Sequence, residues 1–596
     1  MKTQIFFLIM SLLCGSYFVE YMRIPNNGFI WFAVCTVIYF LFAKQKKSQN
    51  RFEKYGFFIF SLIFSIFLVL GYHIRTNFDL YEGLKDVNYR TAYSVNDIFA
   101  LFFLTVVWLL IFKAIFYYTK KISSNISLTQ NIGISNCKHW VIGTFCLFAA
   151  WIPYLLIYYP GFIFGDSLAS IFQALGFWGL SNHHPLLYTF FIKACLNIGM
   201  SLKDINFGCA IYTVLQMLYI SFILSYLVCW IRNKGISRKI CIGLMAFFAF
   251  VPFIPLNSIA MWKDPIFSAS LALWSILLFD FVLSKGTVVH QKHGFIPLYV
   301  IALLILCFSR NNGFYIVLFS IFAFVFIILI NHKKQLLHHT KKLLLSTVAV
   351  AIFVSIITGP VYTHFNLQGE PVESLGIFLN QMARVAATDG DMNSEDAAFM
   401  DSLLPLENYP STYRPCVVDR LKWDENFNQE YLNSHLSSFI KTYFSLFIKN
   451  PVCYLDAWEL NTFGYWAVNI WELNFDSSNI SKGNLNELDK YPEWGIRQTN
   501  LLDNKYIDFT QIFRIDNSVL SLAIINWLVF FITLLMIITK KTQWGIAIAP
   551  SLGLITTLII ATPYAYWQRY GLAEYYLLPF YILLTIFVLK YNHSES

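Results

Sequence analysis

Long apolar runs separated by short polar stretches dominate this chain. Most runs measure roughly 16 to 23 residues, the length that an α-helix needs to cross about 30 Å of hydrocarbon. They predict about 14 transmembrane helices, at residues 5–22, 28–43, 57–74, 98–118, 140–159, 209–231, 240–258, 265–283, 295–308, 314–330, 344–361, 518–539, 543–561 and 577–590. The pattern therefore predicts an all-α polytopic membrane protein.

Basic residues in the connecting loops set the orientation of these helices. Lys and Arg gather in loops 232–239, 285–292, 333–342 and 540–541, which the positive-inside rule assigns to the cytoplasm. The segment 185–200 is also apolar, but it is short and carries a lysine. If it crossed the membrane, the orientation of every later helix would be reversed and all four basic loops would lie outside the cytoplasm. We therefore expect it to lie on the outer membrane surface as an interfacial helix.

Composition supports a multi-pass protein of the plasma membrane. Of the 596 residues, 57% are hydrophobic and 13% are charged, whereas about a quarter of a soluble domain is charged. The net charge of +9 conceals an asymmetry, because residues 362–517 hold 22 Asp and Glu against 11 Lys and Arg. Since the basic excess elsewhere lies in short loops, it follows the orientation rule, and we expect no nucleic-acid partner.

The charge and hydropathy patterns divide the chain into four parts. Residues 1–139 predict a four-helix membrane region, and residues 140–361 a membrane core whose first large external loop is 160–208. Residues 362–517 are long enough for one extracytoplasmic domain of mostly helical or mixed structure. Residues 518–596 predict a C-terminal three-helix membrane region.

Two features of residues 362–517 leave alternatives open. Cys416 and Cys453 could form a disulfide if the segment is extracytoplasmic. The aromatic stretch Trp458–Trp471 is typical of a domain core or an interfacial belt, and less often of a sugar-stacking surface. The other cysteines lie mostly inside apolar runs, and no Cys-x-x-Cys motif supports a metal or redox centre.

Polar residues collect at the outer ends of the predicted helices. Ionisable side chains and two polar neighbours occur there: Asp166, His183, His184, Lys263, Asp264, Arg310, Asn311, Arg569 and Tyr570. Pumps and ion-coupled carriers usually place ionisable groups inside their spans. A single layer of such groups at the outer headgroup level indicates a site that acts on something at the membrane surface.

Each candidate also has a structural interpretation. Asp166 could accept a proton as a general base, or cap the helix that its sequence context predicts. His183 and His184 precede a proline, so they could bind phosphate or a metal ion, transfer protons, or only begin a helix. Lys263, Arg310 and Arg569 are natural phosphate ligands, although each alone could contact lipid headgroups or cap a helix.

Five parts of the sequence carry a resemblance to a known family: Pro160–Ser167, Asn182–Leu186, Trp262–Asp264, Glu373–Gly376 with Gln381–Arg384, and Gln568–Tyr570. They resemble motifs of the GT-C superfamily of membrane glycosyltransferases, and in part those of a poorly characterised bacterial branch of it. The resemblance spans most of residues 140–590, and the first four helices look like an addition. It implies an inverting transfer of a hexosyl or pentosyl group from a polyprenyl-phosphate donor to an extracytoplasmic glycopolymer, glycolipid or protein.

The resemblance also implies roles for the candidates. Asp166 would be the general base, and Lys263, Arg310 and Arg569 would stabilise the leaving lipid phosphate. The remaining substrate-binding residues would be His183, His184, Asp264, Asn311 and Tyr570. The acidic pair of many relatives is here Asp166-Ser167, and no Trp-Trp-Asp motif is evident. The absence of that motif favours transfer without a divalent metal ion, and no cofactor is expected.

Two other classes of protein remain open. A lipid-linked oligosaccharide flippase also suits a 14-helix count, but it would need a charged central cavity and pseudo-symmetric halves. A structural subunit of a wall-assembly complex would need neither.

Overall fold

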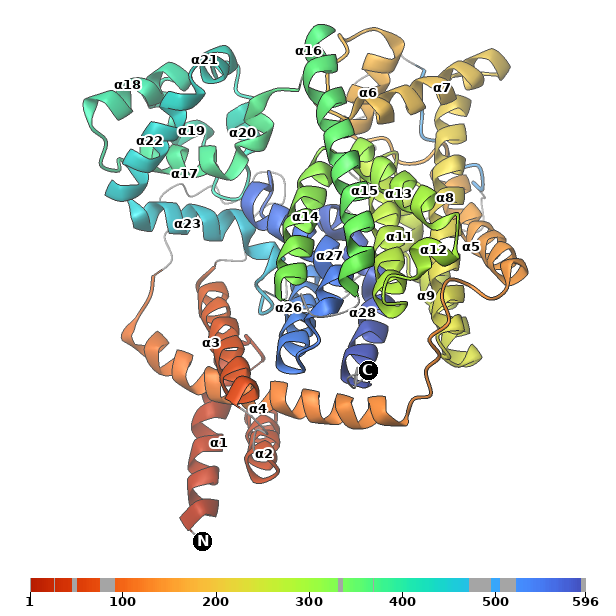
Figure 1. Cartoon of the computed structure of the whole chain (residues 1–596). Helices are drawn as coiled ribbons and strands as arrows, with labels where there is room; N and C mark the ends of the chain where they lie inside the picture. The colour runs from red at the N-terminus through yellow and green to blue at the C-terminus, as the bar shows by residue number, and fades with distance from the viewer. Residues whose placement is uncertain are drawn as a thin grey trace.

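The computed structural model describes residues 2–25, 27–45, 51–74, 92–330, 336–367, 369–470, 495–503 and 521–590. Nearly all regular structure within these ranges is helical, and the only β pairing there consists of isolated bridges. The expectation of an all-α protein is therefore confirmed for the described residues (Figure 1).

Ten helices among the described residues are long and apolar enough to cross a membrane. They are α1 (Lys2–Tyr21), α3 (Arg51–His73), α4 (Val95–Asn125), α5 (Cys137–Ile157), α8 (Ile205–Asn233), α11 (Lys263–Leu283), α14 (Asn312–Ile330), α15 (Leu336–Ile356) with its extension to His364, α27 (Gly545–Ala561) and α28 (Leu572–Lys590). Four shorter apolar helices accompany them: α2 (Gly28–Ala43), α7 (Leu186–Leu202), α13 (Phe295–Ser309) and α26 (Leu522–Ile538). These helices indicate a multi-pass membrane protein.

The expectation of one continuous helix over 240–258 is wrong. The chain there forms α9 (Arg238–Phe250) and the short α10 (Phe253–Ser258), separated at Val251 and Pro252. Val251 is extended, with ψ 108°, as favoured for a residue before proline. Pro252 has no N–H to continue the hydrogen-bond ladder, so the helix ends and restarts one turn later.

Helix α11 forms the centre of the membrane region. It is buried along almost its whole length, against α8, α13, α27 and α28. Figure 1 shows α13, α14, α15 and α27 running side by side around it, with α4 crossing beneath α28. Because α11 begins at Lys263, the charged residues of its first turn, Lys263 and Asp264, lie at one end of this bundle.

The linker of residues 126–136, between α4 and α5, is held by buried polar contacts at the opposite end of the bundle. Lys234 and Asp280 form an ion pair in which both side chains are almost fully buried. Asp280 also accepts hydrogen bonds from the Gly133 N–H at 2.7 Å and from Trp230 Nε1 at 2.9 Å. These contacts attach the linker to α8 and α11.

A separate helical unit occupies the upper left of Figure 1. It comprises α17 (Gly376–Ala387), α18 (Ser394–Leu403), α19 (Tyr409–Thr412), α20 (Asp419–Lys422), α21 (Gln429–Ser434), α22 (Leu436–Lys449) and α23 (Pro451–Thr462). Its own apolar core extends from Val372 to Tyr454, and a buried ion pair between Arg384 and Asp456 joins α17 to α23. We call this unit the helical domain.

The structure decides two alternatives left open by the sequence. Cys416 and Cys453 are both free thiols that belong to different apolar clusters, so no disulfide joins them. Tyr465 and Trp466 are buried in two apolar clusters and therefore do not form a sugar-stacking surface. Trp471 lies outside the described residues.

Candidate functional site

The segment before α6 (Gly165–Leu175) holds Asp166 against the start of α11. Phe162 exchanges backbone hydrogen bonds with Ile259 and Met261 on the strand-like approach to α11. Gly161 makes this approach possible, because its φ is +119° and a Cβ there would lie 2.5 Å from the Ile259 carbonyl oxygen. The Ser167 hydroxyl also donates to the Met261 carbonyl at 2.6 Å.

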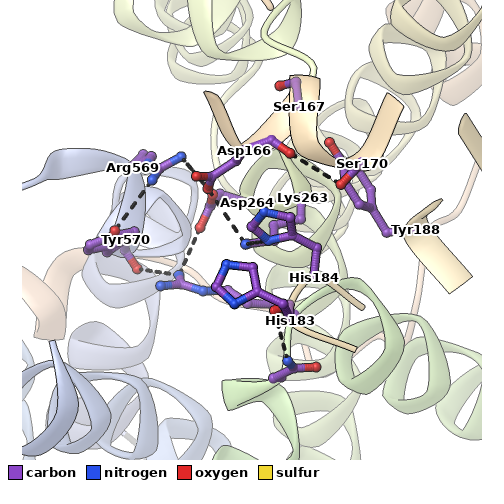
Figure 2. A network of polar contacts seen from close by, with 12 residues as sticks. Asp166, Ser167, Ser170, His183, His184, Tyr188, Lys263, Asp264, Arg569 and Tyr570 are labelled. Carbon is purple, nitrogen blue, oxygen red and sulfur yellow. Dashed lines mark hydrogen bonds and ion pairs between the residues drawn. The ribbon is translucent and has the colours of Figure 1, made fainter. Parts of the chain in front are cut away.

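Asp166 lies in the first turn of α6 but does not cap it. The N-cap residue is Phe164, and it makes no side-chain capping bond. The Asp166 carboxylate instead lies 3.1 Å from Arg569 Nη1 and 3.6 Å from Lys263 Nζ. Figure 2 shows it between Arg569 on one side and Lys263 with His184 on the other. The capping interpretation of Asp166 is therefore wrong.

The environment of Asp166 keeps it ionised. Burial raises the pKa of the Asp166 carboxyl, but the Arg569 guanidinium and the Lys263 ammonium outweigh that effect and hold its pKa well below the usual range. About a third of the side chain, 33%, remains exposed. Asp166 is thus a partly accessible carboxylate between two cations.

Asp264 continues this arrangement into the interior. Its fully buried carboxylate lies 2.9 Å from Arg310 Nη1 and 3.9 Å from Arg569 Nη1. The charges therefore alternate in the order Lys263, Asp166, Arg569, Asp264 and Arg310, which we call the charge row. Three cations face two carboxylates, so one positive charge is in excess.

Aromatic rings surround the two guanidinium groups of the charge row. The Arg569 guanidinium lies 4.6 Å from the ring centre of Trp262, 4.1 Å from that of Trp567 and 5.0 Å from that of Tyr570. The Arg310 guanidinium lies 4.7 Å from the same Tyr570 ring. Such faces attract cations and exclude water, so Tyr570 fixes both arginines in place.

The two histidines have different partners. His184 Nδ1 lies 2.7 Å from Lys263 Nζ, so a neutral imidazole accepts a hydrogen bond from the ammonium group. His183 Nδ1 lies 3.8 Å from Glu373 Oε1 in the segment that leads into the helical domain. Asn311 donates to the His183 carbonyl at 3.4 Å and so ties this loop to the turn beside Arg310. In the described ranges, no group of three or more His, Cys, Asp or Glu is arranged to hold a metal ion.

The protonation of His184 gives a first prediction. Burial, followed by the Lys263 charge, lowers the pKa of His184 well below its ordinary value of 6.5. Below about pH 6.5 the unfolded chain binds a proton that the folded His184 refuses, so the free energy of unfolding falls by up to about 1.4 kcal/mol per pH unit. We expect His184→Gln, whose amide oxygen can accept from Lys263, to lose part of this acid sensitivity.

Unfolding of the detergent-solubilised protein between pH 8 and pH 5 measures this effect. The free energies of unfolding of wild type and His184→Gln should change in parallel above pH 6.5, and that of wild type should fall more steeply below it. Parallel curves over the whole range would contradict the assignment of a neutral His184.

A cavity of about 1020 Å³ opens beside the end of the charge row. Its polar part includes Asn182, His183, Arg310, Asn311, Tyr570 and two carboxylates, Glu370 and Glu373. Its apolar part lies between three helices, at Phe319 of α14, Val354 of α15 and Ile560 of α27. Asp166, Lys263, Asp264, His184 and Arg569 are not among the residues that line it, so Arg310 and Tyr570 connect the cavity to the row.

The structure joins all nine residues singled out from the sequence into one network, and it adds Glu373. The Glu373 carboxylate accepts from Lys422 at 2.9 Å, and Lys422 also pairs with Asp419 at 2.7 Å. Glu373 lay within a recognised motif, but no feature of the sequence placed it beside His183. Its position just after a predicted span, at the same outer level as the other candidates, was the available signal.

The helices and the charged site define a multi-pass membrane protein with a polar site at one end of its bundle. Residues 178–595 match the model of a family of unknown function, DUF6020, and the chain belongs to this family. The matched range contains the site residues from His183 to Tyr570 and begins after Asp166. No curated protein and no solved structure matches the chain.

Proposed function

We propose that this protein is a membrane glycosyltransferase that moves a sugar from a polyprenyl-phosphate donor to a hydroxyl group of an extracytoplasmic acceptor. The acceptor would be a cell-wall or surface glycopolymer, a glycolipid or a protein. The observation that carries the proposal is the cavity, whose polar end meets the charge row and whose other walls are formed mostly by apolar residues of α14, α15 and α27, with Thr556 and Thr557 among them.

The chemistry of such a donor suits both ends of the cavity. A phosphate cannot be buried without partners, and Arg310 offers a planar fork of donors at the polar end. The excess positive charge of the row compensates the phosphate charge. The polyprenyl chain would follow the apolar walls formed by Phe319, Val354 and Ile560.

The transfer would be a direct displacement. The acceptor oxygen attacks the anomeric carbon and forms a new C–O bond, while the bond from that carbon to the phosphate oxygen breaks with inversion. The lipid phosphate leaves with the electron pair, and Arg310 with Arg569 and Lys263 stabilises the charge. Asp166 orients the hydroxyl and takes its proton late, when the forming bond has made that proton acidic enough for a carboxylate of low pKa.

The same proposal fixes a membrane orientation. Fourteen spans result if α2, α13 and α26 cross the membrane together with the ten candidate helices, if α9 and α10 cross as one span, and if α7 lies in the interface. This count requires α4, which runs across the end of the bundle in Figure 1, to cross as well. The basic loops then face the cytoplasm, as the positive-inside rule requires. The charge row, the cavity and the helical domain would then be on the extracytoplasmic side of the plasma membrane.

Turnover with defined donors tests the proposal. Purified protein is incubated with a panel of polyprenyl-phosphate sugars and a cell-wall extract, and lipid-phosphate release and acceptor labelling are measured. Release that accompanies labelling would support a glycosyltransferase. Absence of turnover with every donor, together with movement of the lipid across vesicles, would reject it in favour of a flippase.

A larger side chain in the apolar part of the cavity should weaken use of the donor. Thr556 lines the cavity on α27, and Thr556→Trp would fill space that the lipid chain needs. Overpacking that costs about 1–3 kcal/mol corresponds to a rise in donor KM of about 5-fold to 150-fold. Initial rates over a donor series measure the change. Phe322→Trp, on an exposed face of α14, is the matched control and should leave KM unchanged.

A further inference from the structure

The helical domain carries an exposed apolar corner where α22 turns into α23. Five side chains of the two helices are exposed there: Phe444, Phe447, Ile448, Val452 and Leu455. Ile448 is 76% exposed and Val452 is 64% exposed, so most of each side chain lies outside the core of the helical domain. We name this set the α22–α23 corner.

The sequence of α23 has no polar residue to present to water. Its exposed positions are Pro451, Val452 and Leu455, and Trp458 is partly exposed on the same face. Its acidic residues Asp456 and Glu459 are buried, and Asp456 pairs with Arg384 inside the domain. A helix whose outer face is entirely apolar is unusual beside water and typical of a membrane interface.

The contacts of α23 place it at the level where membrane helices end. Trp458 Nε1 donates to the Ile559 carbonyl at the end of α27, at 3.2 Å. The Trp458 ring also lies 6.3 Å from that of Phe67, near the end of α3. Figure 1 shows α23 lying across the view, whereas α14, α15 and α27 run from top to bottom. Two candidate spans therefore end at α23, which runs along the surface that they reach.

Exposed apolar residues extend from the end of α27 to the α22–α23 corner, and charged residues border this apolar surface on α22. Ile560, the neighbour of the residue that accepts from Trp458, is exposed at the end of α27. On α22 the corner is flanked by two lysines that are each paired with a carboxylate: Lys449, next to Ile448, pairs with Asp396, and Lys441 pairs with Glu395. Lysines at the border of an apolar surface are typical of a membrane interface, because the apolar stem of lysine lies along the hydrocarbon while its ammonium group reaches the headgroups.

We propose that the α22–α23 corner inserts into the outer part of the lipid leaflet on the side of the charged site. The helical domain then rests on the membrane through this corner and does not stand free in water. Lipid therefore covers the α22–α23 corner, and a protein partner bound to the same residues would be incompatible with the proposal.

Photo-crosslinking of the full chain in phosphatidylcholine vesicles tests the proposal. Four chains carry one p-benzoylphenylalanine each, at Ile448, at Leu455, at Phe322 on the exposed face of α14, or at Glu430 on α21. Phe322 reports contact with lipid, and Figure 1 shows α21 on the far side of the domain from α23. Mass spectrometry counts the lipid adducts, and size-exclusion profiles establish that each chain is folded.

Positions 448 and 455 should give lipid adducts at about the yield of position 322 and about tenfold or more above that of position 430. Yields as low as that of position 430 would overturn the proposal, because the corner would then face water. Crosslinks from 448 or 455 to protein in place of lipid would overturn it as well.

Discussion

The Asp166→Asn variant should lose sugar transfer by a factor of about 10² to 10⁴ while it still folds and inserts into membranes. Asparagine has the same shape but cannot accept the hydroxyl proton. It also removes the negative charge that separates Lys263 from Arg569, at 3.6 and 3.1 Å from the carboxylate. Donor turnover and acceptor labelling measure the loss, and size-exclusion chromatography in detergent checks the fold.

Glu373→Gln is the informative control for Asp166→Asn. Glu373 is the carboxylate that lines the cavity beside His183, whereas Asp166 does not line it. We expect Glu373→Gln to change the apparent KM more than kcat, because its side chain contacts His183 and Lys422. Equal transfer by wild type and Asp166→Asn, with loss in Glu373→Gln, would move the base from Asp166 to Glu373.

Loss of the Lys234 ammonium group should destabilise the fold without touching the site. Lys234→Met leaves the Asp280 carboxylate buried without its cation, and removal of one member of a buried pair costs about 3–5 kcal/mol. The free energy of unfolding in mixed micelles measures the effect. It should fall by this amount, and the linker of residues 126–136 should become more sensitive to protease.

Two further variants separate this mechanism from general damage. Lys234→Met combined with Asp280→Asn should recover part of the loss, because asparagine is neutral and its single amide oxygen can still accept from one of the two donors, the Gly133 N–H or Trp230 Nε1. Lys292→Met removes an exposed lysine that donates to the Ile132 carbonyl of the same linker, and should cost less than about 1 kcal/mol. An equal loss in Lys292→Met would contradict the role of burial.

The helices of the membrane region could be located from the sequence because lipid offers no hydrogen-bond partners to the backbone. Every backbone group must be satisfied within the helix, so spans read as long apolar runs, and α8, α11 and α27 lie where such runs occur. The interruption between α9 and α10 could not be predicted from hydropathy. Val251 and Pro252 are as apolar as their neighbours, and hydropathy does not register the missing N–H of proline.

The members of the charge row could be predicted, but not their pairing. Charge and outer position identified Asp166 and Arg569, yet their contact joins residues 403 positions apart and depends on how α6 meets the turn before α28. The capping interpretation of Asp166 failed for a local reason, since α6 begins at Gly165 after a Phe164 cap. Glu373 was missed because its role follows only from the position of His183.

The order of charges in the row has a consequence for how an anion would be received. Arg569 is held between Asp166 and Asp264 and among three aromatic rings, so its orientation is set before a ligand arrives. An incoming phosphate would meet dipoles and charges that need little reorganisation, which is the main source of electrostatic catalysis in enzymes. Because the row lies largely within protein, dissolved ions would screen it far less than a basic patch on the surface.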